Sequence, residues 1–213
     1  MSVLHRYTFR ISKSDLQIGF IMDELEAMNM LLRAIGSSPV NSLETPHPDA
    51  INAKATLNRW RKQVQAKGWW CNVDYTVTFT RDAVTGEIPV ATHITKAVFQ
   101  DSSIVIRGNK LYNKAIQSYV FTTNPTAVRI QYDLSWAELP ASLQRHAAYA
   151  AAAQFVMDEI EDAAKSSYFK EQAGIAYVDV KSDDLSQRRL NVFDKTRVYL
   201  ARKGVRPYLR QGF

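Results

Sequence analysis

The chain has 213 residues, of which 46% are hydrophobic and 23% charged, a composition typical of a soluble globular protein. Its single cysteine, Cys71, excludes an internal disulfide, and no apolar run approaches the roughly 20 residues of a membrane span. The N-terminal sequence MSVLHRYTFRISKSD lacks the apolar core of a secretory signal. These features predict a protein made and assembled in a cytoplasm, with no membrane partner.

The net charge of +6 is concentrated at the C-terminus. Residues 188–213 contain eight basic residues and one acidic residue, a net charge of +7, so that residues 1–187 carry −1. The body of the chain is therefore close to neutral, and a basic character that first suggests nucleic-acid binding belongs to the tail alone.

The first predicted element is a helix from Ser14 to Ile35. Its apolar residues recur mostly at three- and four-residue spacing, Ser14 with Gln17 forms a capping-box pattern, and Gly36 supplies the stop. A second helix is expected to begin at Pro48, because proline suits the first helical position, and to end at Gly68.

From Trp69 the apolar period changes to two, which indicates strands. Residues Val73, Tyr75, Val77 and Phe79 alternate with polar ones, and Val128, Ile130, Tyr132 and Leu134 do so again. Between them, the segments 104–107 and 110–112 flank Gly108-Asn109, the pattern of a two-residue hairpin turn. The sequence therefore predicts a small, mostly antiparallel sheet.

Helical periodicity returns at Pro140 and is expected to last to about Lys165, with a further, less regular helix from about Phe169 to Phe193. The segment VYLARKGVRPYLRQGF has no sustained period and is predicted to be an extended arm. The fold class is thus α+β: a bundle of about four helices with an inserted antiparallel β region and an extended C-terminal arm. The predicted segments are 1–69 (leader and first two helices), 70–134 (β region), 135–194 (C-terminal helices packing on the first two) and 195–213 (basic arm).

The sequence predicts no catalytic residue, cofactor or metal site. Histidines 5, 47, 93 and 146 have no zinc-site spacing, and no phosphate-binding or nucleophile motif occurs. The carboxylates Asp158, Glu159, Glu161 and Asp162 could in principle serve a glycosidase, but a solvated helix face is favoured because adjacent helical residues point in different directions.

Three other features permit a structural and a functional interpretation. Trp60, Trp69 and Trp70 lie near basic residues, as in single-strand binding, although packing where helix meets sheet is favoured. The alanines of residues 147–153 allow close approach of another helix, within or between subunits, or simply favour helix with a narrow core face. The basic tail interleaves cations with apolar anchors, which favours docking onto an acidic partner. The predicted docking residues are Arg197, Tyr199, Arg202, Lys203, Arg206, Tyr208, Arg210 and Phe213.

Residues 27–75, AMNMLLRAIGSSPVNSLETPHPDAINAKATLNRWRKQVQAKGWWCNVDY, resemble the N-terminal signature of the tail tubular protein A family, the head-to-tail adaptors (gatekeepers) of short-tailed bacteriophages. DLSWAELPASLQRHAAYAAAAQF resembles the family's passage from its last strand through an acidic-LP junction into an alanine-containing helix. The resemblance spans about residues 20–193.

This resemblance implies a helical bundle with an inserted β region and a structural role without enzymatic activity. It also implies a dodecameric ring of the chain in the virion tail, between the portal protein and the tail nozzle (tail tubular protein B), around the channel through which genomic DNA passes without specific binding. Ring closure needs two different surface patches that meet between neighbours. The alternatives are a virion-associated glycan hydrolase using the carboxylates near Asp158, and a nucleic-acid-binding protein using the basic tail.

Overall fold

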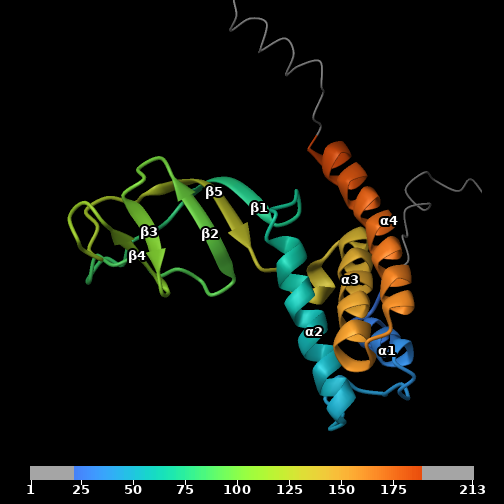
Figure 1. The fold of residues 1–213 in the computed structure, drawn as a ribbon. Helices are drawn as coiled ribbons and strands as arrows, with labels where there is room; N and C mark the ends of the chain where they lie inside the picture. The colour runs from blue at the N-terminus through green and yellow to red at the C-terminus, as the bar shows by residue number, and fades with distance from the viewer. Residues whose placement is uncertain (1–21, 189–213) are drawn as a thin grey trace, which may run out of the picture.

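The computed structural model describes residues 22–188, which form a helical bundle with a β region attached at one end (Figure 1). The helices are α1 (Glu24–Ala34), α2 (Pro48–Gln65), α3 (Ala141–Ile160) and α4 (Ala163–Gln187), with a short 3-10 helix at Trp136–Glu138. The strands are β1 (Val73–Thr78), β2 (Ile94–Phe99), β3 (Ile104–Arg107), β4 (Lys110–Asn113) and β5 (Thr126–Tyr132). All strands lie in the chain between α2 and α3, so the predicted α+β class and the inserted antiparallel β region are confirmed.

The helix predicted from about Ser14 to Ile35 is not continuous through Met22 and Asp23. Residues 14–21 lie outside the described part of the chain, but Met22 and Asp23 are not helical, and α1 begins at Glu24. The extended backbone here is held by tertiary bonds: the Met22 amide donates to Gln144 at 3.2 Å, and the Met22 carbonyl accepts the Trp136 indole N–H at 2.7 Å. A continuous helix through Met22 is therefore wrong, because these bonds occupy backbone groups that a helix would need. The prediction that Pro48 opens the second helix is confirmed.

The β region contains a three-stranded antiparallel sheet in the order β1-β5-β2 and a separate β3-β4 hairpin. Gly108 turns the hairpin with a φ of +63°, which confirms the predicted turn. The predicted alternation is only partly right: Val73 and Phe79 are buried, whereas Tyr75 is exposed, and Thr76 within β1 has a left-handed φ of +58°.

Helix α3 ends at Ile160, five residues before the predicted end. Glu161 adopts a left-handed φ of +53°, and the Asp162 carboxylate accepts the Lys165 amide N–H at 2.9 Å, which caps α4. Helix α4 thus begins at Ala163 and not near Phe169. The predicted continuation to Phe193 and the extended arm lie largely outside the described residues.

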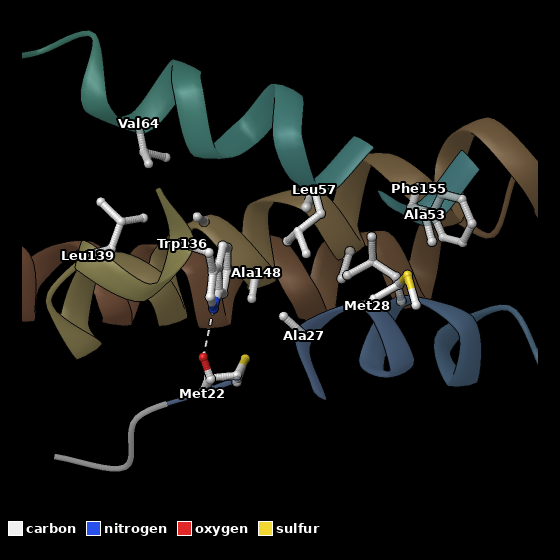
Figure 2. Packing of buried hydrophobic residues seen from close by; sticks show 14 of the residues in the cluster. Met22, Ala27, Met28, Ala53, Leu57, Val64, Trp136, Leu139, Ala148 and Phe155 are labelled. Carbon is white, nitrogen blue, oxygen red and sulfur yellow. Dashed lines mark hydrogen bonds between the residues drawn. The ribbon is translucent and has the colours of Figure 1, made fainter. Parts of the chain in front are cut away.

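Helix α3 is the centre of the bundle and packs against α1, α2 and α4 (Figure 1). Its alanines, with Phe155, face Met28 of α1 and Leu57 of α2 in one hydrophobic cluster, and Figure 2 shows these side chains converging. Trp136 and Met22 belong to the same cluster, and the Trp136 indole N–H donates to the Met22 carbonyl (Figure 2). A second cluster, built around Phe79, Phe99, Leu111 and Ile130 among others, fills the β region. The molecule therefore has two cores, joined where α2 meets the sheet.

Candidate interaction surfaces

The predicted docking residues Arg197, Tyr199, Arg202, Lys203, Arg206, Tyr208, Arg210 and Phe213 all lie outside the described residues. Their role stays a prediction. Within residues 22–188, the junction of α2 with the end of β5 fixes the two cores relative to each other.

A buried polar network joins α2 to the end of β5. The Arg61 guanidinium forms a two-pronged ion pair with Asp133, at 2.7 and 3.2 Å, and also donates to the Leu134 carbonyl. One turn further along α2, the Gln65 side chain accepts the Leu134 amide N–H at 2.8 Å and donates to the Leu134 carbonyl at 3.0 Å. Gln65 is only 2% exposed, so water does not replace these bonds.

The backbone of Gln65 extends the network into the sheet. Its carbonyl accepts from Gln131 at 2.8 Å and from Asn72 at 3.1 Å, and Asn72 donates again to the Tyr132 carbonyl at 2.9 Å. Asn72 is fully buried. Because these bonds have fixed directions and are shielded from water, they set the orientation of the β region on the bundle.

The outward face of α4 carries an exposed apolar stripe. Tyr168, Ile175, Val178 and Leu185 are each more than half exposed, and their spacing of seven, three and seven residues puts them on one face. This face points away from the bundle, since the buried residues of α4, such as Ala173 and Val180, lie on its opposite side. A linear apolar stripe on one helix is the kind of surface that pairs with another helix.

The first half of α2 has a second exposed apolar surface. Ile51 is 59% exposed and, with Ala55 and Asn58, borders a hollow of about 450 Å³ between α2 and the α1–α2 link, whose other side is formed by Leu43 and Pro46. An ion pair between Lys54 and Glu44 lies in the same hollow.

A second hollow, of about 400 Å³, lies over α3 between α2 and α4. Ala150, Ala153 and Ala173 are among its lining residues, and Lys67 donates to the Tyr177 hydroxyl at 2.9 Å. This bond lowers the pKa of Tyr177. The alanine run thus permits close packing of helices within one subunit, which supports the first of the two structural interpretations of residues 147–153.

The carboxylates at 158–162 do not lie on a single helix face. They surround the turn from α3 to α4, where Asp158 accepts from Gln154 at 2.6 Å and Glu159 accepts from Asn52 at 3.2 Å. Asp158, Glu159 and Glu161 are exposed, and Asp162 caps α4. These bonds give three of the four a structural role at the end of the bundle.

The tryptophans pack as favoured. Trp69 is only 6% exposed, its indole N–H donates to the Val64 carbonyl at 2.7 Å, and its ring meets Tyr177 edge-on with centroids 5.9 Å apart. Trp60 and Trp70 pack partly buried against the same cluster. Stacking on single-stranded nucleic acid would need exposed rings, so the packing interpretation is confirmed for Trp69.

Two histidines also have structural settings. His93 stacks on Tyr132 with centroids 5.6 Å apart, and His146 bonds the Ala173 carbonyl through Nδ1 at 2.9 Å. Within residues 22–188 no group of three or more potential metal ligands converges, and no helix there is long and apolar enough to cross a membrane.

The structure is a helical bundle with a β region inserted between its second and third helices, and the apolar stripe on the outward face of α4 offers a surface for contact with another protein. Residues 25–199 match the family model described as tail tubular protein. The chain therefore belongs to the tail tubular protein family, and it is a structural component of a phage tail.

The chain is also similar to the tail tubular protein A of Klebsiella phage KP34. The two are 30% identical over 140 residues, which are 65% of this chain and 74% of the relative. This agrees with the resemblance of residues 27–75.

Proposed function

We propose that the chain is a head-to-tail adaptor that forms a ring between the portal protein and the tail nozzle, around the channel through which DNA leaves the capsid. The observation that carries this proposal is the family match over residues 25–199, which includes the whole bundle and the whole β region. The similarity to a tail tubular protein A adds support for the adaptor role within the tail.

The proposed adaptor works by shape and by multiple contacts, without enzymatic activity. Each subunit contacts two neighbours in a closed ring, which the resemblance implies to be a dodecamer, with the portal on one side and tail tubular protein B on the other. Residues 1–187 carry a net charge of only −1, which suits a channel wall that lets DNA slide, because many phosphate contacts would hold the DNA in place. Assembly takes place in the cytoplasm of the host bacterium.

In this proposal the basic tail docks on the portal. Its cations alternate with aromatic and aliphatic side chains, so that it can both pair with acidic groups and insert apolar anchors into a partner. The residues proposed for this contact are Arg197, Tyr199, Arg202, Lys203, Arg206, Tyr208, Arg210 and Phe213.

The test is to mix the purified full chain with portal protein and to examine the product by electron microscopy and mass measurement. We expect a ring of adaptor subunits on the portal vertex. If no complex and no ring form under any ratio of the two proteins, the adaptor proposal is wrong.

A variant that lacks residues 195–213 tests the tail. Loss of portal binding supports docking, whereas unchanged portal binding with loss of salt-sensitive DNA retention would contradict it and favour a nucleic-acid contact. Circular dichroism of the shortened chain checks that the bundle is intact.

A further inference from the structure

The outward stripe of α4 has no packing partner among residues 22–188. Tyr168 is 57% exposed and Ile175 is 54% exposed, and Glu171 lies between them on the same face. Within residues 22–188, Glu171 has neither an ion pair nor a side-chain hydrogen bond. This face therefore combines apolar side chains with one free carboxylate.

The outward face of α2 is complementary in both respects. The apolar side chains Ile51 and Ala55 border the hollow between α2 and the α1–α2 link, and Arg59 and Lys62 lie further along the same face. Both cations are exposed and have no ion-pair partner among the described residues. The α2 face thus has apolar side chains and two unpaired positive charges. The α4 face has apolar side chains and one unpaired negative charge, so the two faces match.

The helices that carry these faces run in the same direction. Glu159, near the end of α3, accepts from Asn52, near the start of α2, so α2 and α3 are antiparallel. Ser166, near the start of α4, donates to the carbonyl of Ala153 in the second half of α3, so α3 and α4 are antiparallel as well. It follows that α2 and α4 are parallel, on either side of α3 (Figure 1).

The same bonds set the heights of the two faces. Ser166 lies at the level of Ala153, which is six residues, or about 9 Å, before Glu159 on α3. Because α2 is antiparallel to α3, Ala153 and Ser166 lie at the level of the residue six positions after Asn52 on α2. Ala164, two residues before Ser166, therefore lies at the level of Ala55 to within about one residue. By the same count Glu171 lies at the level of Lys62 to within about one residue, with Arg59 a turn below.

We propose that the α4 face of one copy of this chain packs against the α2 face of the next copy, with Glu171 paired to Lys62 and Arg59 of that neighbour. A rotation about an axis along the bundle preserves both helix direction and height, so it brings these two faces together. The two patches are different, and they lie on opposite sides of α3, which is the arrangement that a closed heterologous ring requires. This inference rests on the proposed ring and adds its subunit contact.

Cross-linking tests the contact directly. In the full-length double variant Ala55→Cys with Ala164→Cys, assembled on portal protein, a short bismaleimide is expected to give a ladder of covalent multimers. Each single variant is the matched control, because a heterologous contact puts the two different positions together and gives no multimer with either one alone. The native thiol of Cys71 does not interfere, since burial raises its pKa to about 11 and keeps it protonated.

Charge reversal is the second test. Glu171→Arg is expected to abolish the ladder and the ring, and Arg59→Glu with Lys62→Glu in the same chain is expected to restore them. The control Glu26→Arg makes the same reversal on an exposed position of α1 and is expected to leave the ring intact.

The outcomes separate this inference from the proposed function. If rings form on the portal, but the double cysteine variant gives no ladder and Glu171→Arg assembles normally, the inferred contact is wrong and the adaptor role stands. If single cysteine variants give dimers, the contact is isologous and the inference is also wrong. If the wild-type chain forms no ring on the portal, both proposals fail.

Discussion

Replacing Gln65 by leucine removes the central side chain of the network that joins α2 to β5. The loss that matters most is at Leu134, whose amide N–H donates to the Gln65 side chain at 2.8 Å and has no other partner among the described hydrogen bonds. The Leu134 carbonyl and the Asp133 carboxylate keep Arg61 as a donor. The substitution therefore leaves one donor unsatisfied in a partly buried place, which reduces the free energy of unfolding by about 1–3 kcal/mol.

For a chain of this length, such a loss corresponds to a fall in Tm of about 2–12 °C. The measurement is urea unfolding followed by tryptophan fluorescence and by far-ultraviolet circular dichroism, which together detect separate unfolding of the two cores. Gln63→Leu is the matched control, because Gln63 is exposed on the same helix and its replacement is expected to change stability by no more than about 0.5 kcal/mol. A Gln65→Leu variant as stable as the control would refute the idea that this network orients the β region.

Three further predictions concern single sites. Burial raises the pKa of the Cys71 thiol to about 11, so that roughly one thiol in a thousand is ionised in the folded chain at pH 8. The thiol is therefore expected to react with iodoacetamide at pH 8 at least tenfold more slowly in the folded chain than in 8 M urea. Gly174→Ala is expected to raise the free energy of unfolding by about 0.5–1 kcal/mol, since an added Cβ meets open space on a helix. Gly68→Ala is expected to lower the free energy of unfolding, because Gly68 has a φ of +74°. Equal effects of the two substitutions would contradict this prediction. Burial lowers the pKa of His146, so the unfolded chain takes up its proton first, and stability is expected to fall as the pH drops below about 6.5; His146→Gln should flatten this part of the stability profile.

The helices that could be predicted from the sequence are those with local boundary signals. Pro48 marks the start of α2, and Gly108 marks the hairpin, because each residue restricts the backbone at its own position. The start of α1 could not be found in this way. Met22 is held in an extended conformation by Trp136 and Gln144, more than a hundred residues away in the sequence.

Strand β2 was not predicted for a similar reason. Its pairing with β5 shifts register between Ile94 and Lys96 and again between Val98 and Phe99, so buried side chains do not recur at every second residue. The sequence around the break between α3 and α4 at Glu161 contains no glycine or proline that would indicate the end of a helix. A left-handed glutamate followed by the Asp162 cap is apparent only in the folded chain.

The candidate surfaces show the same division between local and tertiary information. Residues Tyr168, Ile175 and Val178 have a helical spacing that fits a core-facing stripe as well as an outward one, and only the position of α3 decides between the two. The junction network could not be predicted either, because Gln65 and Asn72 are polar residues that sequence patterns place at the surface. They are buried because the backbone of Tyr132, at the end of β5, and of Leu134, just after it, supplies their partners.

The point of insertion of the β region limits where a neighbouring subunit can bind. At the C-terminal end of α2, Lys62 and Ala66 already border a hollow against Thr95 and Tyr132 of the β region. Ile51 and Ala55, earlier on the same face, do not line this hollow, and Lys62 at its border is itself exposed. A neighbouring α4 that followed α2 along its full length would meet the β region, so the proposed contact has to be made by the first half of α4. A cysteine pair at Ala55 and Ala164 samples that half, and the pair at the same register further along, Ala66 and Ile175, is expected to cross-link poorly. Equal cross-linking of both pairs would show that the β region moves away from α2 in the ring, in conflict with the orientation that Gln65 and its partners impose.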